Sequence, residues 1–422
     1  MKIKQKNDNG ITIERRKWIR MNSRERVRAV LQHQLPDRVP NALGGCETEG
    51  LHITAYGELQ KVLNVPPHPP RVDTFMTNAV FEESVIHAMQ GDVILLDSPL
   101  MCKSRLRGDV SDQWKQQELW GKTYSISVKD CFRQNSDGSI VWETAGNVVC
   151  PPGGLYFDRS EPTNLMEAFE VPDPDAFHPW DTYSDELLRH LEKEAKRLYD
   201  ETDLCICLGE SVTDLQYAPC GKIGTMCLML EEPEIMKALL EKCADAGLKQ
   251  IELLEQAVGK YVDILSIAQD FGDNRGVTIG PSLWREIYKP AYKRLFQGWH
   301  QRTGMKINMH SCGSIDAILG DMIECGVDII NPVQTSAANM DARSLKQRFG
   351  KDIVFWGGGY DAQLIPQDAD YQTVYEAVAE NIRILGEGGG YFFSGVHNLP
   401  GNLSQTHLKA MLDAWMDVRD YC

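Results

Sequence analysis

The stretch Met305-Lys-Ile-Asn-Met-His-Ser-Cys-Gly-Ser314 begins as an alternating apolar run and ends in polar residues and glycine. Alternation with a period of two is typical of a β-strand and predicts a strand that ends close to His310. His310 and Cys312 are two positions apart, and side chains at that spacing leave the same face of a strand. An imidazole nitrogen and a thiolate sulfur on one face supply two of the three protein ligands of a catalytic zinc site. The stretch therefore predicts both a strand and part of a metal centre.

The same kind of run, short, apolar and finished by polar or glycine residues, recurs along the chain. The runs lie at 39–44, 92–97, 203–210, 262–270, 306–310, 327–332, 353–357 and 390–394. Stretches of helical period lie around and between them, at 22–31, 184–202, 232–258, 281–303, 314–325, 370–385 and 404–421. Near-continuous apolar strands separated by helices indicate a parallel sheet covered on its outside. Eight such units predict an α/β fold of the (β/α)8 TIM-barrel class.

Two regions depart from this pattern. Residues 1–21 are expected to form an N-terminal extension, helical in character, before a single barrel domain at 22–422. Residues 103–160 are expected to be a β insertion after the second strand. The turn signal Asn135-Ser-Asp-Gly138 followed by the alternating run 139–143 predicts a β-hairpin there. Two roles stay open for the insertion: covering the barrel mouth, or mediating self-association as a homodimer.

Composition narrows the class of partner and the compartment. The 422 residues are 42% hydrophobic and 25% charged, which is ordinary for a globular protein. The formal net charge of -16 disfavours nucleic acid and anionic membrane surfaces as partners, because an acidic chain repels phosphates. No apolar run reaches the roughly 18 residues of a membrane span. The 12 cysteines are spread along the chain, and with no secretory signal a cytoplasmic location with free thiols is expected.

Polar side chains follow the ends of the predicted strands, where barrel enzymes carry their chemistry. His397 is the best candidate for the third metal ligand, because it would face the same mouth as His310 and Cys312. The carboxylates that could transfer a proton or orient a ligand are Asp97, Glu210 and Asp270. The residues expected to contact substrate are Gln269, Asn331, Gln334, Tyr360 and Asn398.

Other interpretations of these residues stay open. His397 can instead bond a loop carbonyl or contact the substrate. Asp97 can cap a helix, and Asp270-Phe-Gly-Asp273 can form a turn, since aspartate and glycine favour turns. The triplet Gly357-Gly-Gly359 indicates close backbone packing first, and an anion cradle only second.

Several stretches resemble the uroporphyrinogen decarboxylase superfamily, and in particular its corrinoid-dependent methyltransferase branch. They are Asn22-Ser-Arg-Glu-Arg-Val, Pro36-Asp-Arg-Val-Pro40, Asp270-Phe-Gly with Arg275-Gly and Pro281, His310-Ser-Cys-Gly313, Gly326-Val-Asp-Ile-Ile-Asn-Pro332, Trp356-Gly-Gly-Gly359 and the tail 388–400. The resemblance implies a barrel with its site at the C-terminal mouth. In the methyltransferases a His-x-Cys follows the fifth strand, as His310 and Cys312 do here, and a Cys usually follows the eighth. This chain departs from that pattern in having His397 there.

The resemblance implies a zinc-dependent methyltransferase. The methyl group would move between a small molecule, such as a thiol or a methyl ether, and the cobalt of a separate corrinoid protein. The chain itself shows no cobalamin-binding module, so the cofactor would arrive on that partner. The other branch gives the alternative, a metal-free decarboxylase of a porphyrinogen-like polycarboxylate, matched by Asp97, Gly395-Val-His397 and Arg38. A third alternative is a barrel that holds a corrinoid protein or a metabolite without turnover.

Overall fold

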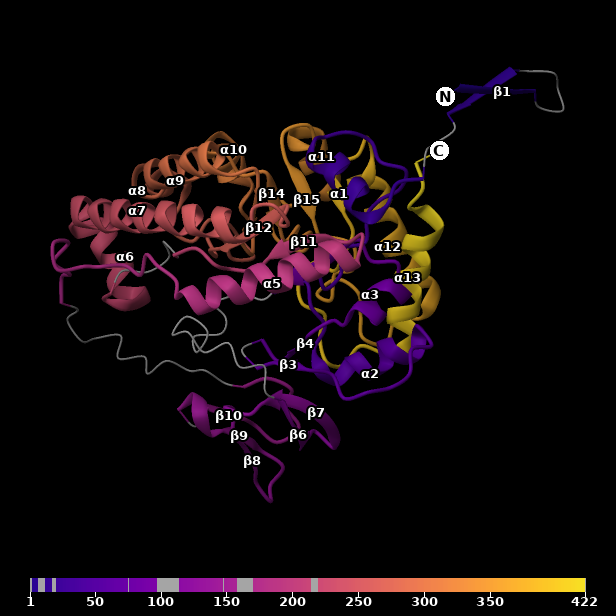
Figure 1. Cartoon of the computed structure of the whole chain (residues 1–422), viewed down its shortest axis with the longest axis horizontal. Coiled ribbons are helices and arrows are strands. Elements are labelled where there is room, and N and C mark those ends of the chain that lie inside the picture. The colour runs from indigo at the N-terminus through magenta and orange to yellow at the C-terminus, as the bar shows by residue number, and fades with distance from the viewer. Residues whose placement is uncertain are drawn as a thin grey trace.

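The computed structural model describes residues 2–6, 12–16, 20–74, 76–96, 114–146, 148–157, 170–213 and 219–421. In this part of the chain a curled parallel sheet has the strand order β16-β15-β14-β13-β12-β11-β5, and helices cover its outside (Figure 1). The strands are β5 (Val93–Leu96), β11 (Cys205–Leu208), β12 (Ile264–Ala268), β13 (Lys306–His310), β14 (Ile329–Asn331), β15 (Val354–Trp356) and β16 (Tyr391–Phe392).

The first predicted strand fills the eighth position of the barrel without forming a regular strand. Ala42 N donates to Phe393 O at 2.8 Å on one side. Asp92 N donates to Asn41 O at 2.7 Å on the other. Pro40 has no N–H to give to the sheet, which interrupts the ladder. The segment closes the ring between β16 and β5, and the predicted (β/α)8 class is confirmed.

Every predicted helical stretch forms a helix, and the one at 281–303 divides into two. The helices are α1 (Ser23–Leu31), α2 (Ile53–Val62), α3 (Glu83–Ala88), α5 (Asp185–Glu201), α6 (Gly221–Glu231), α7 (Pro233–Val258), α8 (Pro281–Ile287), α9 (Lys289–Arg302), α10 (Asp316–Cys325), α11 (Ala342–Phe349), α12 (Tyr371–Gly386) and α13 (Gln405–Val418). Local sequence sets several starts, since Asn22, Ser184, Asp370 and Ser404 each cap a helix through the side chain. None of the described helices is long and apolar enough to cross a bilayer.

The insertion consists of β-strands, as predicted, but it is larger than one hairpin. β6 (Trp114–Leu119) pairs antiparallel with β7 (Lys122–Ser127). A second antiparallel sheet contains β8 (Phe132–Gln134), β9 (Ile140–Trp142) and β10 (Val148–Cys150). In Figure 1 these strands lie together below the barrel, beside the short strands β3 (Val72–Asp73) and β4 (Asn78–Ala79).

The expectation of a helical N-terminal extension is wrong. β1 (Lys2–Lys6) and β2 (Thr12–Arg16) pair as antiparallel strands. Each segment has a single isoleucine among polar residues, so neither shows the repeating apolar stripe of an amphipathic helix. The sequence between them contains Asn9-Gly10, the dipeptide that most favours a tight hairpin turn.

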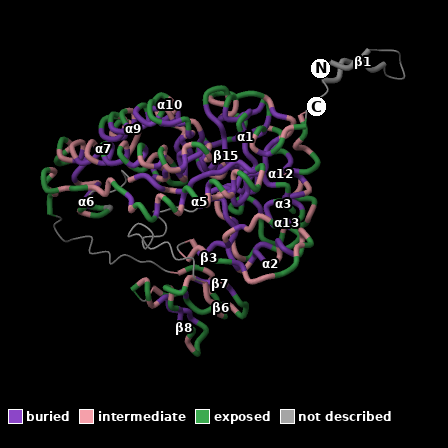
Figure 2. The backbone as a smooth tube through the Cα atoms, viewed as in Figure 1, coloured by how far each residue is buried: buried purple, intermediate pink, exposed green. Residues whose placement is uncertain are grey.

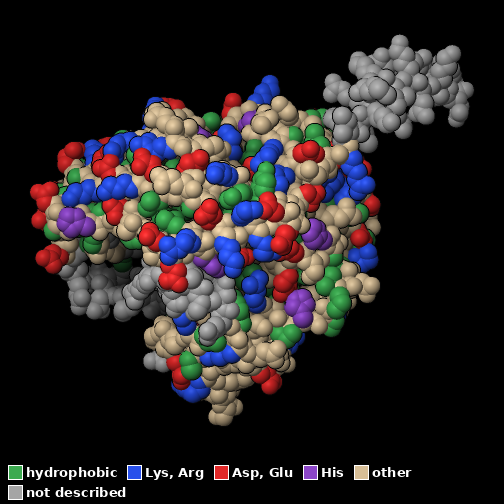
Figure 3. Space-filling view, in the orientation of Figure 1, with side chains coloured by type: hydrophobic (Ala, Val, Ile, Leu, Met, Phe, Trp, Pro, Cys, Tyr) green, Lys and Arg blue, Asp and Glu red, His purple; other side chains and the backbone are tan. Residues whose placement is uncertain are grey.

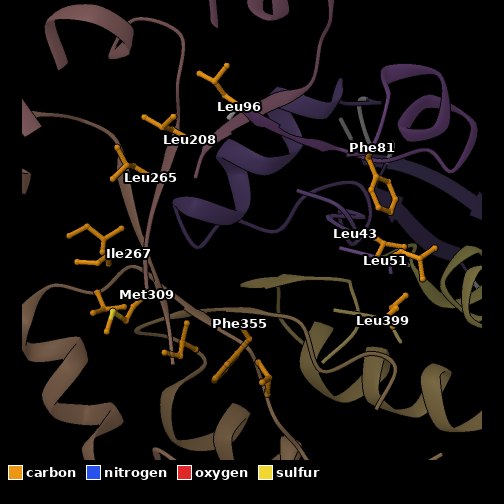
Figure 4. Packing of buried hydrophobic residues seen from close by; sticks show 14 of the residues in the cluster. Leu43, Leu51, Phe81, Leu96, Leu208, Leu265, Ile267, Met309, Phe355 and Leu399 are labelled. Carbon is orange, nitrogen blue, oxygen red and sulfur yellow. The ribbon is translucent and has the colours of Figure 1, made fainter. Parts of the chain in front are cut away.

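The core lies in two layers, one between the sheet and the helices and one inside the barrel, and buried backbone fills the middle of the molecule (Figure 2). Figure 4 shows side chains of the outer layer, among them Leu208, Leu265 and Met309. Cys205 and Cys207 are fully buried inside the barrel, as their apolar context predicts. On the surface shown in Figure 3, acidic and basic side chains are interspersed over the helices.

Candidate metal centre

Three side chains converge at the carboxyl end of the sheet. His310 is the last residue of β13, Cys312 follows it, and His397 lies in the segment after β16. Their ligand atoms all lie within 4.8 Å of one another. Cys312 Sγ is 3.3 Å from His310 Nε2, and the centroids of the two imidazole rings are 5.2 Å apart. The three residues selected from the sequence as metal ligands thus form a group that could hold one ion.

The alternation along β13 explains why His310 faces the mouth. Ile307 and Met309 pack in the outer layer against the helices, so Asn308 and His310 point to the barrel interior. After Cys312 the chain turns at Gly313, with φ of +83°. A Cβ at this position would lie 2.5 Å from the carbonyl carbon of Gly272, so only glycine fits the turn.

The electrostatics of the group suit a cation. Burial lowers the pKa of His310, and burial with the neighbouring His310 lowers the pKa of His397 to about 3. Both rings are therefore neutral, as metal-binding imidazoles must be. Burial, followed by the Asp270 carboxylate, raises the pKa of the Cys312 thiol. A metal ion would reverse that shift, because coordination stabilises the thiolate.

Asp270 lies on the open side of the group. Its Oδ1 accepts a hydrogen bond from Cys312 N at 2.9 Å and is 3.8 Å from His310 Nε2. The Asp270 side chain is 53% exposed, whereas that of His310 is only 7% exposed. Asp270 thus places a half-exposed carboxylate beside two of the three candidate ligands.

Of the other two predicted carboxylates, only Glu210 lies in the described residues. Asp97 falls outside the described residues. Glu210 is described, and its backbone N donates to the carboxylate of Glu47 at the mouth. The structure therefore places Glu210 beside a second carboxylate, and no ligand atom of it belongs to the metal group.

Two of the residues expected to contact substrate accept hydrogen bonds from the backbone of loops at the mouth. Gln334 Oε1 accepts from Gly313 N at 2.8 Å, and so holds the turn after Cys312. Asn398 Oδ1 accepts from Gly50 N at 2.6 Å. Both amides therefore fix the backbone of loops that border the site.

Gln269 and Tyr360, two more of these residues, are buried. Gln269 accepts from the hydroxyl of Tyr292 at 2.5 Å and is 3% exposed. The hydroxyl of Tyr360 shares a hydrogen bond of 2.8 Å with His407 Nδ1 on α13. Neither polar group reaches the three candidate ligands through a hydrogen bond in the described residues.

One part of the site was missed in the sequence. Thr48 and Glu49 follow the first barrel segment and contact Asn331, the last residue of β14. Glu49 is fully buried, and burial raises its pKa to about 8 against the opposing effect of the Ser394 and Asn331 hydrogen-bonding groups. The signal was present, because the first strand ends in Gly44-Gly-Cys-Glu-Thr-Glu-Gly50, with two acidic residues at a strand end.

Comparisons with known proteins agree with this fold. Residues 162–418 match the family model for uroporphyrinogen decarboxylase (URO-D). A methyltransferase from Methanosarcina mazei superimposes with a TM-score of 0.53 at 13% identity, covering 94% of this chain and 99% of that one. Xylanase B from Clostridium stercorarium F9 gives a TM-score of 0.32 at 10% identity, covering 55% and 84%. No curated protein matches by sequence. At 13% identity, the methyltransferase shows a likeness of fold alone.

Proposed function

The chain belongs to the uroporphyrinogen decarboxylase family, and on this basis we propose that it is a zinc-dependent methyltransferase. It would move a methyl group between a small molecule, such as a thiol or a methyl ether, and the cobalt of a separate corrinoid protein. The observation that carries the proposal is the convergence of His310, Cys312 and His397, with ligand atoms within 4.8 Å of one another. A metal-free reaction gives no reason for a partly buried thiol grouped with two neutral imidazoles.

Zinc suits this donor set. Two imidazole nitrogens and one thiolate leave a fourth tetrahedral position open, the arrangement typical of catalytic rather than structural zinc. When bound, zinc would act as a Lewis acid, which lowers the pKa of a thiol or polarises the leaving oxygen of a methyl ether.

Side chains of the protein would transfer the proton that the reaction releases or consumes. A thiol acceptor must lose a proton, and an ether donor must gain one at oxygen as its methyl group leaves. Asp270 is the best-placed group for either transfer, because its carboxylate lies beside Cys312 and is half exposed. Glu210 and Asp97 are the further candidates for this role or for orienting the substrate.

The partner and the compartment belong to the same proposal. The corrinoid would be carried by a separate protein that presents cobalt to the barrel mouth. Covering the mouth and forming a homodimer are the two roles we propose for the insertion. The cysteines in the described residues are free thiols, which fits a reducing compartment such as the cytoplasm.

The decarboxylase alternative is supported by the match to the uroporphyrinogen decarboxylase family model. The arginine that the resemblance would place near the substrate is Arg38. Its guanidinium is bound instead to Asp92, with Nη1 2.7 Å from Oδ2. Asp92 precedes β5, so this pair lies at the amino end of the barrel, opposite to the mouth. The observation disfavours Arg38 as a carboxylate-binding residue.

Methyl transfer to free cobalamin tests the proposal. Zinc-loaded protein is incubated with Co(I) cobalamin and a panel of methyl ethers, methanol and methylated thiols, and methylcobalamin is followed by its visible spectrum. We expect transfer from at least one compound, and loss of transfer in Cys312→Ala but not in Cys325→Ala, which removes a buried cysteine from the end of α10. Carbon dioxide release from a porphyrinogen by metal-free protein would support the decarboxylase instead.

A further inference from the structure

We propose that Asn331, held by Thr48 and Glu49, is a positioning residue that fixes His310 with a proton on Nδ1 and a free electron pair on Nε2. The imidazole would then present its unprotonated nitrogen to the metal before any ion arrives. The inference rests on the proposed function for the identity of the metal. The protonation pattern itself is a property of the metal-free chain.

The orientation of the Asn331 amide follows from its neighbours. One end of the amide lies 3.3 Å from Trp356 O, and a backbone carbonyl can accept a hydrogen bond but cannot donate one. The same end lies 2.5 Å from Glu49 Oε1. That end must therefore be the NH2 donor. The carbonyl oxygen faces the other way, where it accepts from the Thr48 hydroxyl at 2.8 Å.

The orientation of the amide then sets the tautomer of the imidazole. Asn331 Oδ1 is 2.6 Å from His310 Nδ1. An amide oxygen only accepts, so Nδ1 must carry the hydrogen. In the neutral ring the free electron pair is then on Nε2. This is the atom 3.3 Å from Cys312 Sγ, so the nitrogen that meets the other candidate ligands is the one free to bind a metal.

The backbone holds this chain of contacts in place. His310 and Asn331 are direct partners in the register of β13 and β14, and Ser311 N donates to Asn331 O at 2.7 Å. Asn331 and Glu49 are both fully buried. The backbone oxygen of Glu49 accepts a hydrogen bond from Gly44 N at 2.7 Å, which ties Glu49 to the end of the first barrel segment. The contacts with Thr48, Glu49 and Trp356 O hold the Asn331 amide in one orientation.

This assignment replaces the expectation that Asn331 contacts substrate. Both ends of its amide are occupied by protein groups, and its side chain has no exposed surface. A substrate would have to displace Thr48 or Glu49 to reach it. Partners of this kind orient metal-binding histidines, and their loss commonly weakens metal affinity by about 10- to 100-fold.

Nitrogen-15 NMR of the metal-free protein with labelled histidine tests the tautomer directly. The His310 signals are identified by their absence in His310→Ala. We expect a protonated Nδ1 and an unprotonated Nε2 in the wild type, and a mixture of tautomers in Asn331→Ala. A wild-type His310 that carries its proton on Nε2 would overturn the inference, whether or not the protein binds zinc.

Zinc affinity gives a second readout, by competition with a coloured chelator. Asn331→Ala should bind zinc about 10- to 100-fold more weakly than the wild type. Glu49→Gln should stay close to the wild type, because its amide oxygen can still accept from Asn331, whereas Glu49→Leu should weaken binding. Asn308→Ala is the matched control: this asparagine is equally buried, lies on β13 and binds Ser266 rather than His310.

The outcomes separate this inference from the proposed function. If the wild type binds no zinc but has the expected tautomer, the metal assignment fails and the positioning role stands. If the wild type binds zinc and Asn331→Ala binds it equally well, the positioning role is wrong and the methyltransferase proposal is untouched. A loss of affinity in Asn308→Ala as large as in Asn331→Ala would also contradict the positioning role, since it would reflect general damage to the barrel.

Discussion

His397 is the third candidate ligand, and without it the metal group would have only two. It lies after β16, far in the sequence from His310 and Cys312 at the end of β13. Its ring lies 5.2 Å from that of His310, and burial keeps it neutral by lowering its pKa to about 3. We predict that His397→Ala binds zinc at least tenfold more weakly while the barrel remains folded, because the residue lies in a loop. Zinc content and circular dichroism check both parts.

The control for this variant is His300→Ala, which removes a histidine on α9 that bonds Gly326 O outside the barrel. His300→Ala should keep its zinc. If His397 contacts substrate instead, His397→Ala will keep full zinc and raise only KM. That result would remove His397 from the ligand set.

Asp270 gives a prediction about the chemical step rather than the metal. Asp270→Asn keeps an oxygen that can accept from Cys312 N but loses the carboxylate. Loss of a proton-transferring group typically lowers the rate by about 10²- to 10⁴-fold, so we expect kcat to fall in this range. Zinc content should be unchanged. A variant with normal kcat would show that another group, such as Glu210, moves the proton.

At the scale of elements, the end of β15 is shaped by its contact with the first barrel segment. Gly357 has φ of +107°, and a Cβ there would lie 2.9 Å from Gly395 O and 3.0 Å from Glu49 Oε1. We predict that Gly357→Ala destabilises the protein by about 1–3 kcal/mol, from backbone strain alone. It should also weaken zinc binding, because it pushes on Glu49. Urea unfolding measures the first effect.

Gly304→Ala is the matched control for the glycine variant. A Cβ at this position meets nothing within 4 Å, and its φ is not in the left-handed region. It should change stability by less than about 0.5 kcal/mol. Equal effects of the two substitutions would contradict the role given to the contact between Gly357 and Glu49.

The junction between α2 and the insertion should respond to pH. His52 caps α2 through Nδ1, and its Nε2 donates to Leu155 O at 2.8 Å. Burial lowers the pKa of His52 from 6.5 to about 4. Below pH 6.5 the unfolded chain takes up a proton that the folded state refuses until about pH 4, so stability falls as the pH falls through this window.

We therefore predict that His52 alone lowers the free energy of unfolding of the wild type by about 2 kcal/mol as the pH falls from about 7 to about 5. His52→Asn keeps a side chain that can cap α2 but cannot titrate. The free energies of unfolding of the two proteins should converge as the pH falls. Parallel curves over this range would show that His52 does not contribute the proposed pH dependence.

For the whole molecule, the barrel could be predicted because its strands are buried on both faces. Within the runs 203–210 and 262–270, residues 204–208 are wholly apolar and residues 264–268 include one polar residue, Ser266, and this marks them without knowledge of their neighbours. His310 and Cys312 were paired because two alternate positions on one strand share a face, whereas β13 ends at His310 and Cys312 lies in the segment that follows it. His397 was found by assuming that the ends of all barrel strands meet.

The other features of the site depend on contacts between residues far apart in the sequence, which no local sequence pattern indicates. Asn331 and Glu49 are 282 positions apart, and only barrel closure brings their side chains together. Polar residues at strand ends, such as Gln334 and Asn398, could be identified in the sequence. Their hydrogen bonds to the backbone of Gly313 and Gly50 could not be predicted from the sequence, because these bonds depend on which loops lie side by side. The extension was wrongly predicted to be helical, because each of its strands has a single apolar residue and only the Asn9-Gly10 turn signal indicates the hairpin.

The proposed chemistry requires that His310, Cys312 and His397 hold a catalytic zinc. The most direct test is the zinc content of the purified protein, measured by mass spectrometry of the metal in the wild type, in Cys312→Ala and in Cys325→Ala. We predict close to one zinc per chain in the wild type and in Cys325→Ala, and loss of the metal in Cys312→Ala. A wild type that stays metal-free after incubation with zinc, or a Cys312→Ala protein that keeps a full complement, would contradict the claim.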